Sequence, residues 1–255
     1  MTVNLYLQRI LTLVLLTFFL LSAASAQVKK RTPVKPAKNR QTQTVKQPTA
    51  EELNDLADKY FFGEDGMDMN REKAFELWLQ SAKMGNAWGQ GKSADNEKLT
   101  DEERVSWARK SAEQGCWIGM EVLANAYANG DLGLPVDDVQ ANYWSKRYAD
   151  TGVPVGLYNY GWRLLRGKIK ISENRDENTK KAIEYWEKSA EQNYAPAIRE
   201  LVFGYGDGFI RINEVNEGVR VQYDFPNNRE KFLYWLRKGA ELEDVGFMHI
   251  LAENL

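Results

Sequence analysis

Residues 181–192 read KAIEYWEKSAEQ, and residues 107–115 read WARKSAEQG. In both stretches a Trp is followed, four or five residues later, by an Ala. This arrangement occurs five times, and the aligned alanines are Ala82, Ala112, Ala149, Ala190 and Ala240. Steps of three and four residues keep side chains on one face of a helix. The stretches predict five helices whose Trp rings fill the core. These rings are Trp78, Trp107, Trp144, Trp186 and Trp235.

A second pattern, Leu-small-x-x-Tyr-x-x-Gly or a close variant, alternates with the first. Its copies span residues 56–63, 123–130, 160–167 and 201–208. The final Gly ends a helix, since it tolerates the left-handed conformation. Capping residues mark several helix starts: Thr49 with Glu52, Thr100 with Glu103, Asn70, Asn178, and Asn227 with Glu230. We predict antiparallel helix pairs that must stack, because no single pair can bury its apolar face alone.

Together the two patterns resemble the Sel1-like repeat, a relative of the tetratricopeptide repeat. The resemblance covers about residues 50–255, and residues 181–192 are its closest copy. It implies an all-α fold, a right-handed α/α solenoid of about 4 to 5 Sel1-like repeats whose first helices line a concave surface. It also implies a non-catalytic protein that binds other proteins.

Three segments depart from the repeat. Between Gly85 and Thr100 the first helix of its unit shrinks to about residues 87–92, which should leave a notch. Residues 209–225, in the last repeat, alternate apolar and polar side chains on either side of Asn-Glu-Gly, which predicts an inserted β-hairpin. Residues 245–255 begin the first-helix pattern without completing it, so we expect a C-terminal capping helix.

The N-terminal residues predict export. Residues 1–26 carry a basic Arg9, a short apolar run and an Ala-Ser-Ala site, as in a signal peptide cleaved after Ala26. An uncleaved N-terminal anchor is the alternative. Residues 27–49 are rich in Pro, Gln, Thr and basic side chains and predict a disordered linker. This linker is either simply solvated or makes weak electrostatic contact with an anionic membrane surface. We expect a periplasmic location.

Composition excludes several functions for the folded part. Residues 1–50 contain eight basic side chains and no acidic ones, so the remainder holds 26 basic and 36 acidic side chains, a net charge of −10. An acidic body of this size repels phosphate backbones and disfavours nucleic-acid binding. One Cys allows no internal disulfide, and one His excludes multi-His zinc sites. We expect no cofactor, no metal and no catalytic residue.

Aromatic and Arg side chains outside the repeat register are the candidates for partner binding, because protein interfaces enrich these residue types. Three of them lie in one predicted first helix, and three lie in the hairpin, whose strand edge could also pair with a partner strand. The seven candidates are Trp88, Tyr158, Trp162, Arg166, Arg211, Arg220 and Tyr223.

These observations favour an exported adaptor, scaffold or regulator that binds a protein in the bacterial envelope as a monomer. An alternative is an immunity protein that neutralises an envelope-targeted toxin such as a phospholipase effector, because an acidic body would attract a basic toxin. A carboxylate-based hydrolase of cell-wall material or β-lactams ranks third, since no nucleophile, base and orienting group stand together in the sequence.

Overall fold

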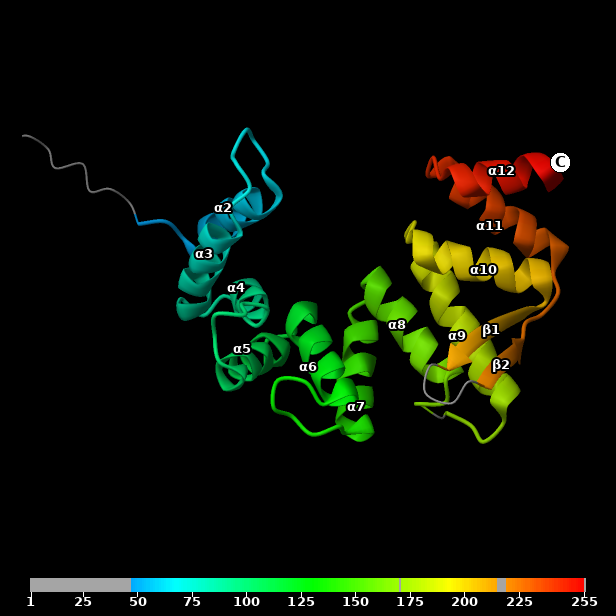
Figure 1. Cartoon of the computed structure of the whole chain (residues 1–255), viewed down its shortest axis with the longest axis horizontal. Helices are drawn as coiled ribbons and strands as arrows, with labels where there is room; N and C mark the ends of the chain where they lie inside the picture. Colours follow the sequence, from blue (N-terminus) through cyan, green and yellow to red (C-terminus); the bar gives the residue numbers. More distant parts are fainter. Residues whose placement is uncertain (1–46, 170, 215–218, 255) are drawn as a thin grey trace, which may run out of the picture. The chain divides into compact units, whose positions relative to one another are not determined.

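The computed structural model describes residues 47–169, 171–214 and 219–254, with the backbone alone for residues 210–223. Figure 1 shows the succession of helices and labels the first of them α2. The elements are α2 (Ala50–Phe62), α3 (Arg71–Lys83), α4 (Ala87–Ser93), α5 (Asp101–Glu113), α6 (Trp117–Asn129), α7 (Asp138–Asp150), α8 (Pro154–Leu165), α9 (Arg175–Ala190), α10 (Ala195–Asp207), β1 (Phe209–Glu214), β2 (Val219–Asp224), α11 (Arg229–Glu241) and α12 (Val245–Asn254). Within the described ranges, no helix has the length and apolar character needed to cross a membrane.

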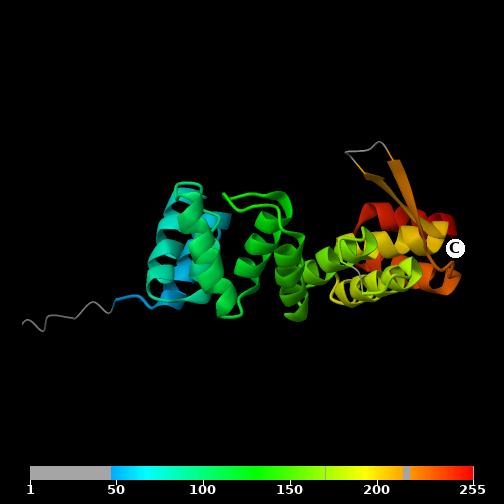
Figure 2. The ribbon, with the colours of Figure 1, turned by 90° about the horizontal axis from the view of Figure 1, so that it is seen from below.

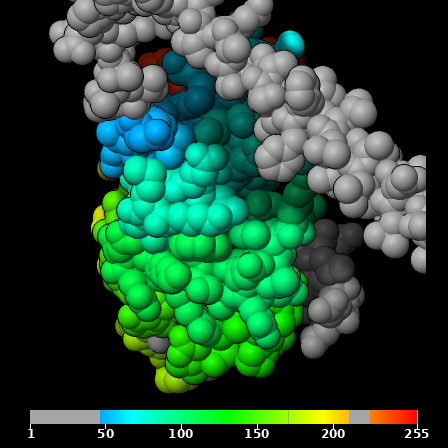
Figure 3. Space-filling view, turned by 90° about the vertical axis from the view of Figure 1, so that its left-hand side faces the viewer, coloured from blue at the N-terminus to red at the C-terminus, as the bar shows by residue number. Residues whose placement is uncertain are grey.

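Each helix packs mainly on its neighbours in sequence, which makes the chain from Pro48 onward a solenoid of helix pairs. Its buried apolar side chains form three clusters. One lies between α2 and α3 around Trp78, one joins α5 to α7 around Leu123, and one runs from α8 to α12 around Trp186. Figure 3 looks from the α2 end, where side chains of the first repeats form one continuous surface. The predicted all-α solenoid fold is confirmed.

Helix boundaries follow the capping chemistry with two corrections. Thr49 and Thr100 form capping boxes as predicted. Helix α9 begins four residues earlier than expected for an Asn178 cap, because Asn174 caps it while Asn178 lies buried and bonds to the backbone of the preceding loop. Asn228, rather than Asn227, caps α11 and accepts a hydrogen bond from the Lys231 amide.

The five second-helix Trp residues are not all buried. Trp78, Trp186 and Trp235 are at most 3% exposed. Trp107 and Trp144 are half-buried at the edge of their cluster, where Lys110 and Arg147 lie over their rings. Core packing is therefore complete for three rings and partial for Trp107 and Trp144, which pack against their cluster and stay partly open to solvent beside a basic side chain.

The segment after α10 consists of two antiparallel strands, with Ile210 opposite Tyr223 and Ile212 opposite Val221. Figure 2 shows the strand pair projecting beyond the helices. Its connection at residues 215–218 lies outside the described residues. After β2 the chain returns to the core at Phe225, which is buried and packs edge-on against the Tyr205 ring at 4.7 Å.

Helix α4 is only seven residues long, as the shortened unit predicts. Its glycines allow close packing: a Cβ on Gly89 would lie 2.7 Å from the Ser81 hydroxyl, and one on Gly91 would lie 2.8 Å from Ile118. Asp95 follows directly after this short helix, and its position brings it to the first of the hollows described below.

Candidate functional site

Two hollows lie along helix α6, and the side chains of Glu121 and Asn125 line both of them. The first has a volume of about 470 Å³ and is bounded by α5, α6 and the residues that follow α4. The second has a volume of about 430 Å³ and is bounded by α6, α7 and α8. Because the two hollows share a wall, we treat them as one surface, the α6 groove.

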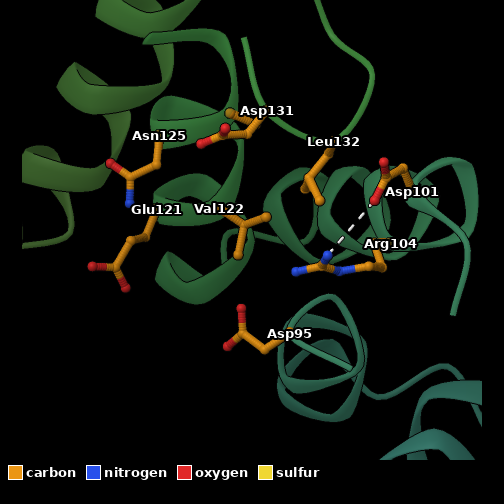
Figure 4. A pocket seen from close by; sticks show the side chains of 9 residues that line it. Asp95, Asp101, Arg104, Glu121, Val122, Asn125, Asp131 and Leu132 are labelled. Atoms are coloured by element: carbon orange, nitrogen blue, oxygen red, sulfur yellow. Dashed lines mark ion pairs between the residues drawn. The ribbon is translucent and has the colours of Figure 1, made fainter. Parts of the chain in front are cut away.

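The first hollow is acidic. Four carboxylates and a single cation line it, namely Asp95, Asp101, Glu121 and Asp131 with Arg104. Figure 4 shows Arg104 extending into the hollow from α5, with Glu121 across from it on α6. The Arg104 Nε donates to the Ala94 carbonyl at 2.8 Å, and its guanidinium lies 3.7 Å from the Asp101 carboxylate. The one cation of the hollow is therefore already engaged.

Glu121 is half-buried, whereas Asp95 is exposed but surrounded by protein atoms. Partial desolvation by these surroundings raises the pKa of both carboxylates, and the charge of Asp95 raises the pKa of Glu121 further. Lys92 lowers both pKa values by its charge, although its amino group lies over the rings of Trp78 and Trp88. Neither carboxylate makes a hydrogen bond or ion pair with a residue that the structure describes. Both would gain from a nearby cation.

The second hollow combines aromatic rings with a free cation. The Trp162 ring packs on the buried Trp186 at 4.9 Å, and the guanidinium of Arg166 lies over the Trp162 ring at 5.1 Å. The Tyr158 hydroxyl donates to Glu200 at 3.2 Å. Arg166 is exposed and makes no ion pair within the described part of the chain. Aromatic rings beside an unengaged Arg are typical anchors of protein interfaces.

Tyr148 departs from a hydrogen-bonding pattern that three other repeats share. The hydroxyls of Ser81, Ser111 and Ser189 each donate to the carbonyl of the first residue of a neighbouring helix, at 2.7 to 3.0 Å. Tyr148 occupies the same repeat position in α7, directly before the aligned Ala149. Its ring instead stacks on Trp117, with a centroid distance of 5.7 Å and an interplanar angle of 7°. Its hydroxyl has no hydrogen-bond partner among the described residues although the side chain is 3% exposed.

The structure brings three of the seven sequence candidates together. Tyr158, Trp162 and Arg166 all line the second hollow. Trp88 lines neither hollow; it packs edge-on against Trp117 at 6.0 Å. The other three candidates lie in the two strands, and their side chains are outside the described residues. These are Arg211, Arg220 and Tyr223.

Sequence reasoning missed the acidic wall of the groove. Asp95, Glu121 and Asn125 are ordinary polar residues in the sequence, and only the stacking of α4, α5 and α6 places them around one hollow. Tyr148 did carry a signal, because a large ring stands where three other repeats have Ser. That substitution marks the repeat that faces the groove.

A comparison with models of protein families shows which family the chain belongs to. The Sel1 repeat matches residues 53–86, 105–116, 118–152, 154–194 and 225–244, which is more than half of the chain. The chain belongs to the Sel1 repeat family. Sel1 repeat proteins are generally non-catalytic modules for protein interaction. A search of curated proteins found no match to this sequence.

Three solved structures are similar to this chain, and the first two share its fold. The protective antigen c5321 of uropathogenic Escherichia coli is 27% identical with a TM-score of 0.53, and the match covers 79% of this chain but only 40% of the antigen. A Sel1 repeat protein from Oxalobacter formigenes is 23% identical with a TM-score of 0.56, over 80% of this chain and 75% of that one. The immunity protein Pa5087 of Pseudomonas aeruginosa is 15% identical with a TM-score of 0.49, over 76% and 69% of the two chains.

Proposed function

We propose that this Sel1 repeat protein is an exported, non-catalytic adaptor or regulator of the bacterial envelope that holds a protein partner in the α6 groove. The observation that carries the proposal is the groove itself. It places Tyr158, Trp162 and an unengaged Arg166 beside a hollow with two unpaired carboxylates. Rings, Arg and polar groups in one depression are the composition of interface hot spots.

Affinity purification from envelope extracts tests the groove. The full mature protein is compared with Arg166→Glu, which reverses the free cation, and with Asn125→Arg, which fills the wall shared by both hollows. Arg237→Glu, an exposed Arg on α11, is the matched control. We expect the main partner to be lost from both groove variants and kept by the control. Each variant is checked for an unchanged thermal melt. Equal recovery of the partner with all three variants would show that the groove does not bind it.

Export is a separate part of the proposal and rests on the pattern of residues 1–26. The protein is expected in the periplasmic fraction with Gln27 as its first residue. N-terminal sequencing of the protein from that fraction identifies this residue. A protein that keeps residues 1–26 and sediments with membranes would instead be anchored.

Immunity to a toxin is a narrower form of the proposal. The excess of carboxylates in the first hollow favours it, because an acidic surface attracts a basic partner. Co-expression with the product of an adjacent reading frame tests it: growth inhibition by that product, relieved by this protein and not by Asn125→Arg, is expected. If the product of the adjacent reading frame is harmless, or if it stays toxic in the presence of this protein, the immunity role is wrong and the adaptor role is retained.

A further inference from the structure

We propose that the α6 groove recognises an arginine-bearing segment of its protein partner, with the guanidinium entering the first hollow between Asp95 and Glu121. This inference rests on the proposed binding function of the groove and specifies the chemistry of the segment that binds there. Four observations support it: the unbalanced charge, the unengaged carboxylates, an unpaired buried hydroxyl and the opposite charge at the far end of the groove.

The charges around the first hollow do not balance. Its carboxylates are Asp95, Asp101, Glu121 and Asp131. Against these four stand two cations, Arg104 in the hollow and Lys92, whose charge acts on Asp95 and Glu121. Lys92 is held over two Trp rings, and Arg104 bonds to the Ala94 carbonyl and pairs with Asp101. The local charge is therefore about −2 near neutral pH, and Asp95 and Glu121 are the carboxylates without a hydrogen bond or ion pair among the described residues.

The Tyr148 hydroxyl is the second, independent sign of a missing partner. Buried polar atoms in proteins are nearly always hydrogen-bonded, and an unpaired one costs about 1 to 3 kcal/mol. Tyr148 forms part of the wall of the second hollow, and burial first, with the charge of Glu121 second, raises the pKa of its phenol. The hydroxyl oxygen is almost fully covered, so a backbone carbonyl of a bound segment would reach it only after a local shift of the surrounding side chains.

Arginine fits these groups better than other basic residues. Its planar guanidinium presents a fork of donors that can engage two carboxylates at once, and it sheds water more readily than the lysine ammonium. Lys92, held over the rings of Trp78 and Trp88, shows that this region already accommodates a cation beside aromatic rings.

The far end of the groove has the opposite charge. Arg166 is exposed over the Trp162 ring, whereas Arg163 is occupied by hydrogen bonds to Asn142 at 2.6 and 3.0 Å. A second cation near Arg166 would be repelled, and an acidic side chain would be attracted. The segment therefore binds in one direction, with its arginine at Asp95 and an acidic or neutral part at Arg166.

A titration with two matched peptides tests the inference. The probes are acetyl-Gly-Arg-Gly-amide and the same peptide with citrulline, which keeps the shape of arginine and lacks its charge. Binding is followed by NMR through the indole N–H signals of Trp117 and Trp162, with Trp235 in the C-terminal core as the reference. We expect the arginine peptide to shift the Trp117 signal saturably and the citrulline peptide to bind at least about tenfold more weakly.

Charge-neutral variants locate the binding. Glu121→Gln and Asp95→Asn should each weaken the arginine peptide several-fold and leave the citrulline peptide unchanged, while Glu241→Gln, an exposed control on α11, should behave as wild type. Thermal melts confirm that each variant is folded. The inference is overturned if both peptides bind equally, if the arginine peptide does not bind, or if Glu241→Gln has the effect of Glu121→Gln. If it fails while Arg166→Glu still loses the partner in affinity purification, the proposed function stands without it.

Discussion

Helices α7 and α9 occupy the same position in successive repeats and do different things. In α9, Trp186 is fully buried and its indole donates to the Tyr158 carbonyl at 3.1 Å. Ser189, one turn later, donates to the Pro154 carbonyl at 2.7 Å. In α7, Trp144 is half-buried under Arg147, and Tyr148 replaces the Ser. One helix completes the core, and the other builds a wall of the α6 groove.

The difference shows that one residue at a repeat position changes how a helix packs on its neighbours: Ser189 bonds to a helix start, whereas Tyr148 is buried and fills space with its ring. Both helices use a Gly of α8 for close approach: a Cβ on Gly161 would lie 2.6 Å from the Trp186 indole nitrogen, and a Cβ on Gly156 would lie 2.7 Å from the Tyr148 ring. The repeat supplies the space in both cases. Because Tyr148 reaches beyond the position of a Ser hydroxyl, it stacks on Trp117 and its own hydroxyl is left unpaired.

The largest expected difference between α7 and α9 is in the free energy of unfolding that is lost when the Trp of each helix is replaced by Ala. Trp186→Ala is expected to lower the free energy of unfolding by about 3 to 5 kcal/mol, because it leaves a large cavity in the main core cluster. Trp144→Ala should cost less than half as much, since its ring is partly in solvent. Urea unfolding followed by circular dichroism measures both, and equal losses would contradict the assigned difference in burial.

Filling the space beside Trp186 should have the next largest effect. Gly161→Ala places a methyl group 2.6 Å from the Trp186 indole nitrogen and 3.1 Å from the Ala182 carbonyl, so the α8–α9 contact must open. Overpacking of this kind costs about 1 to 3 kcal/mol. Asn159→Ala, on the same helix and away from this contact, is the control. An unchanged urea midpoint for Gly161→Ala would mean that α8 and α9 are less tightly packed than described.

The sequence predicted the parts of the fold that repeat. The spacing of Trp and Ala placed the helices, and Gly63, Gly130 and Gly208 end theirs in the left-handed conformation as predicted. It failed where a side chain has two possible roles: Asn178 could cap a helix or bond to a loop, and the fold uses it for the loop. Local sequence cannot decide between these, because both satisfy the same amide group.

The candidate site was less accessible to sequence analysis than the fold. Tyr158, Trp162 and Arg166 lie within one helix, so their shared location followed from helical spacing. Asp95 and Glu121 come from different repeats and meet only through the packing of α4 against α6. Nothing in the residues beside them distinguishes these two carboxylates from the many on exposed helix faces.

Two Tyr hydroxyls should respond oppositely to removal. Tyr205→Phe loses a hydrogen bond to Glu187 at 2.8 Å and one from Lys231 at 3.1 Å, which should cost about 1 kcal/mol. Tyr148→Phe removes a buried hydroxyl without a described partner and should be neutral or stabilising by up to about 1 kcal/mol. Chemical denaturation of the isolated protein gives both values. A loss for Tyr148→Phe as large as that for Tyr205→Phe would show that the Tyr148 hydroxyl is satisfied.

The smallest expected effect is a pH dependence from the groove. Folding raises the pKa of Glu121 above its ordinary value of 4.5, through burial and Asp95 and against Lys92. The folded state then binds more protons than the unfolded state just above that value, so stability falls as pH rises through this window. Glu121→Gln should therefore be slightly more stable than wild type at pH 7, by less than about 1 kcal/mol, and should lose this advantage below pH 4. Thermal melts across this pH range measure the difference, and a destabilised variant at pH 7 would show that the charge is already paired.

The claim that the α6 groove holds the partner is tested most directly by hydrogen–deuterium exchange of the full mature protein with and without the partner recovered by affinity purification. Bound partner should slow exchange in peptides covering residues 117–129 and 154–166 and leave residues 229–241 unchanged. Protection confined to residues 209–225, or to α9 without α6 and α8, would contradict the account.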